Sequence, residues 1–149
     1  MPGEPAAAGP AHEDLYNDSI VIDLTCPALR ERPDLIGDWY AAGVTVVAPT
    51  IAANHDPQST LLTMARWLRI LRDDERLWHV RTVADIYTAK AKRRLGIMFA
   101  FQNTQPIATS SELLYAYHQL GRAHTVRSRV GGGRGGPCDR VAAFPPRRP

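Results

Sequence analysis

Cysteine is scarce in this sequence of 149 residues, which contains only Cys26 and Cys138. Two distant cysteines give neither the framework of a disulfide-rich secreted domain nor the close spacing of a metal finger. The first twelve residues lack the basic cluster and apolar run of a signal peptide. No stretch approaches the ~20 apolar residues of a membrane span. We therefore expect a cytoplasmic protein without a membrane partner.

Acidic residues are scarce in only one region. Residues 127–149 hold six arginines and one aspartate, whereas residues 1–126 hold 12 Lys or Arg and 14 Asp or Glu. The net charge of +3 and the pI near 9.1 therefore come from the C-terminal segment. Because the remainder is slightly acidic, its composition argues against a nucleic-acid-binding domain.

Apolar runs and helical periodicity alternate along the middle of the chain. The runs are rich in residues that favour strands and are apolar on both faces, which is typical of a buried parallel sheet. Asp56 before Pro57, and Thr82 three residues before Asp85, are typical helix starts. The predicted strands are 20–24, 44–48 and 95–101, with a fourth beginning at Arg122 and fading by Val126. The predicted helices are 33–42, 57–73, 82–92 and a segment from Ser110 or Ser111 to Leu120.

Three glycines lie at the junction between a predicted helix and the strand that follows it, in the pairs Ala42-Gly43, Leu95-Gly96 and Leu120-Gly121. In each pair we expect the glycine to end a helix in a left-handed turn and to begin a strand. Repeated βα units predict an α/β fold, either a small doubly wound sheet or part of a (β/α)8 TIM barrel. A complete barrel needs ~250 residues, so only the first three to four units would fit.

Polar clusters follow three of the predicted strands, where active groups lie in both architectures. Asp23 and Thr25 are two positions apart and would project from one side of an extended segment. The Asn54-His55-Asp56-Pro57 cluster has typical loop and cap residues, so we interpret its histidine as an exposed loop residue. Gln102 and Asn103 supply two amides that can hydrogen-bond a peptide or carboxylate but cannot act as acid or base. We therefore predict Asp23, Thr25, Gln102 and Asn103 as substrate-cleft candidates and no catalytic residue.

Several short motifs occur in a characteristic order along residues 20–126. They are Val21-Ile22-Asp23, Asp85-Ile86, Leu95-Gly96-Ile97, Gln102-Asn103-Thr104 with Pro106-Ile107, and Leu120-Gly121. In these motifs the chain resembles the membrane dipeptidase (renal dipeptidase-like) family of zinc metallopeptidases. The resemblance implies a (β/α)-barrel hydrolase that cleaves dipeptides with two zinc ions.

The sequence departs from this family at the metal positions. Family enzymes place a His-x-Asp doublet after the first strand, where this chain has Thr25 and Pro27. They place a zinc-bridging Glu after a later strand, where this chain has Gln102. The resemblance thus implies zinc in the intact family, but we expect no cofactor and no metal ligand in this chain. A truncated, inactive relative of these dipeptidases is the leading hypothesis, and its intact form would take a small dipeptide-like ligand.

The C-terminal segment differs from the rest of the chain. Six Arg, five Gly and four Pro in residues 127–149 cannot supply a strand and its following helix. We divide the chain into a flexible lead-in (1–18), a partial barrel (19–126) and a disordered tail (127–149), and we interpret the tail as out-of-frame translation. Unpaired strand edges would favour non-specific self-association. The alternative is a non-catalytic protein that binds a small ligand at Gln102 and Asn103, or RNA through the Arg/Gly-rich tail.

Overall fold

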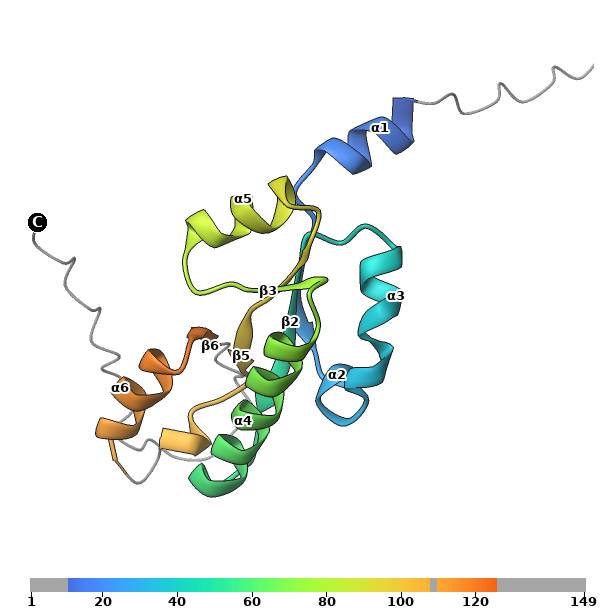
Figure 1. Ribbon diagram of the computed structural model, residues 1–149. Coiled ribbons are helices and arrows are strands. Elements are labelled where there is room, and N and C mark those ends of the chain that lie inside the picture. Colours follow the sequence, from blue (N-terminus) through green and yellow to red (C-terminus); the bar gives the residue numbers. More distant parts are fainter. Residues whose placement is uncertain (1–10, 108–109, 126–149) are drawn as a thin grey trace, which may run out of the picture.

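The computed structural model describes residues 11–107 and 110–125, along which strands and helices alternate (Figure 1). None of the helices in these residues is both long enough and apolar enough to cross a membrane. The strands are β1 (Ile22–Cys26), β2 (Val46–Ala52), β3 (Leu77–His79), β4 (Leu95–Ile97), β5 (Phe99–Phe101) and β6 (Arg122–Thr125). The helices are α1 (Ala11–Asp18), α2 (Ala28–Glu31), α3 (Ile36–Ala41), α4 (Pro57–Asp73), α5 (Val83–Ala91) and α6 (Glu112–Gln119), with 3-10 turns η1 (Pro33–Leu35) and η2 (Gln105–Ile107).

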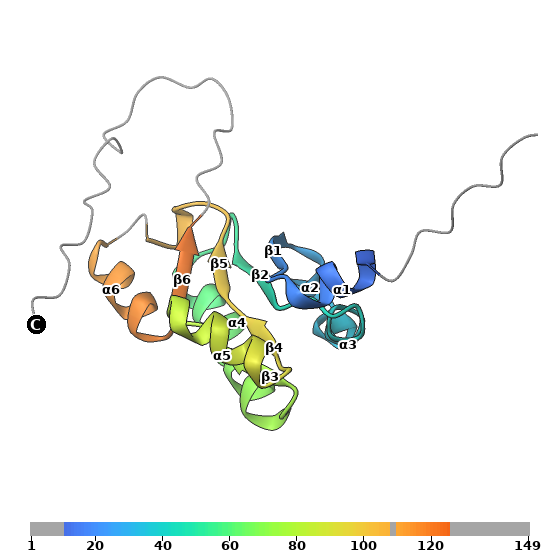
Figure 2. The same cartoon turned by 90° about the horizontal axis from the view of Figure 1, so that it is seen from above.

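The strands form one sheet in which all pairs are parallel. Strands β4 and β5 are separated only by Met98, whose backbone N–H donates to the Val47 carbonyl oxygen at 3.0 Å, so they act as one bent strand. This bent strand pairs with β2, and β2 pairs with β1. From above, β1, β2, β5 and β6 follow one another in chain order (Figure 2). The predicted α/β class with consecutive parallel strands is confirmed, and this order is that of a partial barrel.

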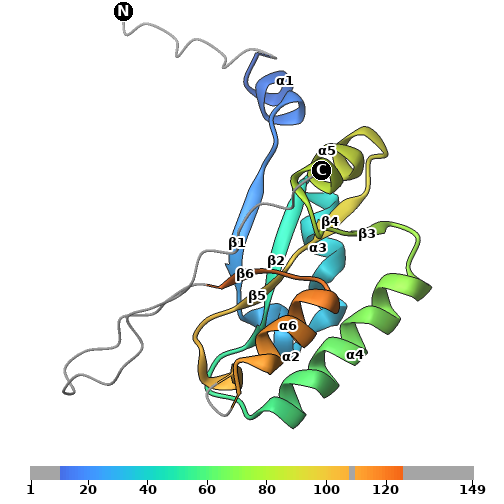
Figure 3. The same ribbon diagram turned by 90° about the vertical axis from the view of Figure 1, so that its left-hand side faces the viewer.

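One face of the sheet packs against helices and forms the core. Val47 of β2 and Ile97 of β4 are register partners and fully buried, so they share this face. Met64 and Trp67 of α4 are buried in the same cluster. Helices α4 and α6 lie in front of the sheet in Figure 3. The helical apolar spacing of residues 57–73 therefore serves to cover the sheet.

Both predicted helix starts are confirmed by their caps. The Asp56 carboxylate accepts a hydrogen bond from the Ser59 backbone N–H at 3.0 Å, and Pro57 begins α4. Thr82 and Asp85 form a reciprocal capping box at the start of α5. Local side-chain chemistry therefore sets these two boundaries.

Two of the three glycine turns are confirmed and the third is wrong. Gly43 and Gly121 have φ values of +72° and +98°, which favour glycine. Gly96 instead lies inside β4, where a Cβ atom would be 2.7 Å from Val80 Cγ2. The left-handed residue before this strand is Arg93, with φ of +53°. Gly96 therefore provides close packing rather than a turn.

Several predicted boundaries also differ from the structure. The first strand begins and ends two residues later than predicted, because Ile22 takes register with Val46. Strand β2 continues past Pro49, whose missing N–H falls at a register irregularity opposite Cys26. Strand β3 was not predicted, because three residues are too few to show a periodic pattern of apolar side chains. The predicted helix 33–42 is divided into η1 and α3.

The predicted flexible lead-in contains helix α1 over Ala11–Asp18. The Tyr16 hydroxyl of this helix donates to the Ala42 carbonyl oxygen at 3.0 Å. The Lys90 ammonium donates to the Asn17 and Ser19 carbonyl oxygens at 2.5 and 2.7 Å. These bonds tie α1 to the sheet domain. Residues 1–10 and the predicted tail 127–149 lie outside the described residues.

Candidate functional site

The carboxyl ends of the parallel strands meet at one edge of the sheet. Strand β1 ends before Pro27 and α2, β2 ends before Asn54, and β5 ends before Gln102. The Gln102 backbone N–H donates to the Ala52 carbonyl oxygen at 2.8 Å, which joins the ends of β5 and β2. Two of the predicted polar clusters therefore become neighbours at this edge.

The side chain of Asn103 links these two clusters. Its Nδ2 donates to Asn54 Oδ1 at 2.5 Å, and its Oδ1 accepts from the Gln105 backbone N–H at 2.9 Å. The Asn103 amide is thus held in one orientation by both of its ends. The Gln102 side chain is exposed beside it. The role of Gln102 and Asn103 in a substrate cleft stays a prediction. The sequence did not indicate the same role for Asn54, which the fold places beside Asn103.

His55 is half-buried, so its interpretation as an exposed loop histidine was wrong. Its Nδ1 accepts a hydrogen bond from the Ala53 backbone N–H at 2.9 Å, which leaves the ring proton on Nε2. Burial lowers the pKa of His55, and the positive charge of Arg30 lowers it further. This imidazole is therefore a neutral hydrogen-bond donor at neutral pH.

Arg30 is a feature of this edge that the sequence did not reveal. Its guanidinium donates to the Ile51 carbonyl oxygen, and its Nε lies 3.2 Å from Glu31 Oε1. Its side chain is 16% exposed, so its charge lies close to the sheet edge rather than in solvent. Helix α2 brings it there only because β1 pairs with β2. No local pattern distinguishes this arginine from those on the surface.

Asp23 lies on the helix-covered face of the sheet and not among the polar residues at the strand ends. It is the register partner of Val47, which belongs to the helix-covered core. Asp23 Oδ2 accepts from Trp39 Nε1 of α3 at 3.0 Å, and Oδ1 accepts from the Thr25 backbone N–H at 3.3 Å. Thr25 is exposed. Both residues stay predictions as cleft residues, but the Asp23 carboxylate already has two donors.

The three side chains that the sequence resemblance matches with the family's metal ligands do not fit zinc. Thr25 offers a hydroxyl, Pro27 offers no donor atom, and Gln102 offers a neutral amide, whereas zinc sites use His, Cys or carboxylate ligands. Within residues 11–107 and 110–125, no cluster of three His, Cys, Asp or Glu side chains could hold a metal. Cys26 is buried, and burial raises the pKa of its thiol. Among the described residues, this edge offers hydrogen-bonding amides, the imidazole of His55 and the guanidinium of Arg30.

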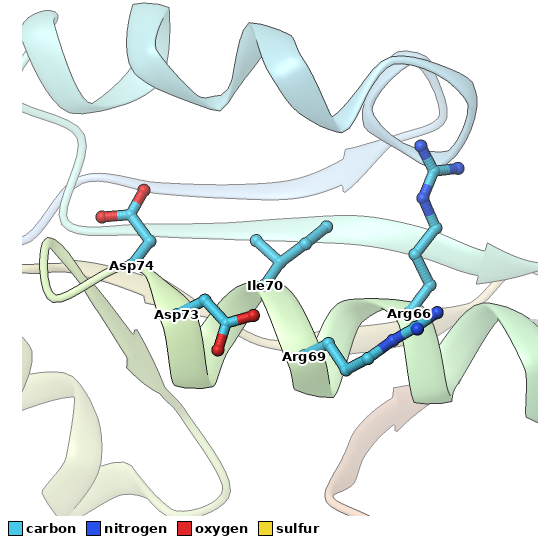
Figure 4. Close-up of a pocket in the computed structure, with 5 residues that line it drawn as sticks. All are labelled: Arg66, Arg69, Ile70, Asp73 and Asp74. Carbon is cyan, nitrogen blue, oxygen red and sulfur yellow. The ribbon is translucent and has the colours of Figure 1, made fainter.

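A shallow cavity of about 530 Å³ lies along α4 and away from this edge (Figure 4). Asp73, one of its lining residues, forms an ion pair with Arg72 at 2.7 Å. Two arginines and two aspartates line it, all on the C-terminal half of α4 or just after it and far along the chain from Asn54 and Gln102, so the cavity does not extend the candidate site. Its lining residues are Arg66, Arg69, Ile70, Asp73 and Asp74.

No family model and no curated protein matches the sequence. Solved structures do match. An amidohydrolase from Pseudomonas aeruginosa has a TM-score of 0.69 and 27% identity over 80% of this chain and 37% of its own. A dipeptidase described as a metallopeptidase of family M19 has a TM-score of 0.58 and 15% identity over 71% of this chain and 41% of its own.

A third match is a metallopeptidase from Rhodobacter sphaeroides, solved with a phosphinate mimic of the dipeptide L-Ala-D-Ala. It has a TM-score of 0.55 and 15% identity over 70% of this chain and 44% of its own. This chain therefore spans about two fifths of the length of these neighbours. The predicted resemblance is confirmed at the level of fold: the chain has the architecture of one part of a TIM-barrel amidohydrolase or membrane dipeptidase-type metallopeptidase.

Proposed function

We propose that this chain is a truncated, catalytically inactive relative of the membrane dipeptidase-like metallohydrolases. The sequence resemblance supports the proposal, because it matches Thr25, Pro27 and Gln102 with the family's His, Asp and Glu ligands. In the intact family, zinc supplies an activated water and polarises the scissile carbonyl. Among residues 11–107 and 110–125, no cluster of three His, Cys, Asp or Glu side chains could hold zinc in this way. A cytoplasmic location is part of the same proposal.

Restoring the family ligands tests this assignment. The full chain should bind no zinc at micromolar concentrations and should not hydrolyse L-alanyl-D-alanine. A triple variant with Thr25→His, Pro27→Asp and Gln102→Glu should gain zinc binding, measured by calorimetry and by metal content after dialysis. The matched control carries Gln119→Glu instead of Gln102→Glu, at the far end of α6. Zinc-dependent hydrolysis by the unmodified chain would refute the proposal.

The C-terminal residues 127–149 belong to this proposal as out-of-frame sequence. The composition of this segment supports the proposal, because six arginines and four prolines follow soon after β6. The coding DNA beyond the Val126 codon should, in another frame, continue with a Tyr-Asn-containing loop and later histidines. Finding no such continuation would leave the truncation without support.

A second candidate function is non-catalytic binding of a small dipeptide-like ligand at the same edge. The hydrogen bond from Asn103 to Asn54, with His55 and Arg30 beside the same strand ends, favours it, because oriented amides and a cation suit a peptide carboxylate. Titration with L-alanyl-D-alanine should shift NMR signals of these residues. Asn103→Ala should weaken the binding, whereas Gln119→Ala should not. Salt-sensitive RNA retention lost on deletion of residues 127–149 would instead indicate a role of the tail.

A further inference from the structure

A second cavity lies at the opposite end of the sheet from the candidate site. Its volume is about 670 Å³, within the range of small-molecule sites. It includes Thr45 and Leu95, which stand at the amino ends of β2 and β4, and residues from the ends of α1, α3 and α5. The cavity is therefore separate from the strand carboxyl ends. The remaining lining residues are Asn17, Asp18, Tyr40, Ala41, Gly43, Val44, Ala89, Lys90, Arg93 and Arg94.

Positive charge dominates this cavity. Three cations, Lys90, Arg93 and Arg94, line it with a single carboxylate, Asp18. The Lys90 ammonium already donates to two carbonyl oxygens at the end of α1. Neither arginine forms an ion pair with another described residue, although the Arg94 guanidinium lies 5.6 Å from the ring centre of Trp78. The cavity thus has two guanidinium groups that form no ion pair within the described residues, and three cations against one carboxylate.

Arg93 occupies a backbone position that suits glycine better. Its φ of +53° lies in the left-handed region, which an arginine adopts at a cost in free energy. The same turn after α3 uses Gly43, with φ of +72°. Strained backbone of this kind clusters at functional sites, so a role of the Arg93 side chain is a reasonable hypothesis. Here that side chain lines the charged cavity.

We propose that this cavity binds a small polyphosphate anion of the size of pyrophosphate. Planar guanidinium groups bind phosphate oxygens in pairs, and adjacent arginines neutralise a multiply charged anion. A monocarboxylate would leave most of the local positive charge without a partner. The site is independent of the function proposed for the strand carboxyl ends, since the two share no residue.

Arg93→Gly in the full chain separates ligand binding from folding. The substitution removes the guanidinium and also relieves the left-handed backbone, so the melting temperature should stay the same or rise. Pyrophosphate binding, measured by calorimetry in low-salt buffer, should weaken about tenfold, as for one lost charge-assisted hydrogen bond. Arg94→Gln should also weaken it. The matched control is Lys92→Ala, which removes one charge from the same turn but does not line the cavity.

Three outcomes would overturn the proposal. One is the absence of pyrophosphate binding by the full chain. Another is equal binding by the full chain and the Arg93→Gly variant, since the anion would then bind elsewhere, for example to residues 127–149. The third is an equal loss in the Lys92→Ala control, which would indicate general attraction to a basic surface rather than a site.

Discussion

Strands β1 and β2 are paired neighbours of similar apolar character, yet their burial differs. All seven residues of β2 are buried, whereas in β1 only Cys26 is buried, and Ile22 and Leu24 are 39% and 48% exposed. Strand β2 has partners along both edges, while β1, within the described chain, has a partner along one. The difference shows that an apolar run predicts a strand but does not predict how deeply it is buried.

The largest effect should come from truncating a side chain of β2. Ile51 is fully buried in the core, so Ile51→Ala should lower the free energy of unfolding by about 2–5 kcal/mol. The corresponding change in β1, Leu24→Ala, should cost about 1 kcal/mol or less, because half of that side chain is already in water. Urea unfolding of both variants gives the two values. Equal losses would remove the contrast between the strands.

The next effect concerns the close packing at Gly96. A methyl group there would contact Val80 and Val46 at less than normal separation, so Gly96→Ala should destabilise the fold by about 1–3 kcal/mol. The control is Gly37→Ala in α3, where no atom lies within 4 Å of the new Cβ. That helix substitution should be neutral or stabilising by up to about 1 kcal/mol. Thermal unfolding that ranks the two variants the other way would contradict the packing at β4.

A smaller effect is expected at the start of α5. Thr82→Ala removes the capping box and should cost about 1 kcal/mol. Thr82→Ser keeps the hydroxyl and should restore most of that loss. Hydrogen exchange should locate the change in the first turn of α5. A uniform change over the whole sheet would contradict a local role for this cap.

A pH effect should arise at His79 of β3, whose ring packs against Phe99 with centroids 4.8 Å apart. Burial lowers the pKa of His79, and the charge of Arg81 lowers it further. The unfolded chain, with a pKa near 6.5, then binds the proton more tightly than the folded chain. The contribution of His79 to the free energy of unfolding should therefore be fully present above about pH 6.5 and should be lost as the pH drops below that value.

The variant His79→Phe should reduce this loss of stability between pH 6.5 and 5. The pKa of His55 is lowered in the same direction, so part of the pH dependence should remain. Urea unfolding of both proteins at several pH values measures the difference. An unchanged pH dependence would show that His79 does not titrate differently in the two states.

The smallest effect on folding should come from placing a charge on the exposed part of β1. Leu24→Lys should change the free energy of unfolding little but should reduce self-association, because an edge lysine opposes strand pairing between molecules. Light scattering at increasing concentration measures this. Leu62→Lys, at an exposed position of α4, is the control and should have no such effect, since Leu62 is not on a strand edge. Monomeric behaviour of the unmodified chain would contradict the predicted self-association.

Much of the local structure could be predicted because its causes are local. The start of α4 follows from Asp56 and Pro57, and the turn after α6 follows from Gly121. The role of Gly96 could not be predicted, since it depends on Val80, which is distant in sequence and adjacent in space. At the candidate site, Gln102 and Asn103 were visible as polar residues after a strand.

The sequence by itself determined the alternation of strands and helices and the parallel sheet, because periodicity and helix caps are properties of neighbouring residues. Only the tertiary structure decided which side chains meet. It brought Asn54 to Asn103 and Arg30 to the end of β2, and it turned Asp23 toward Trp39. Strand pairing determines these contacts, and it joins residues whose separation along the chain carries no local signal.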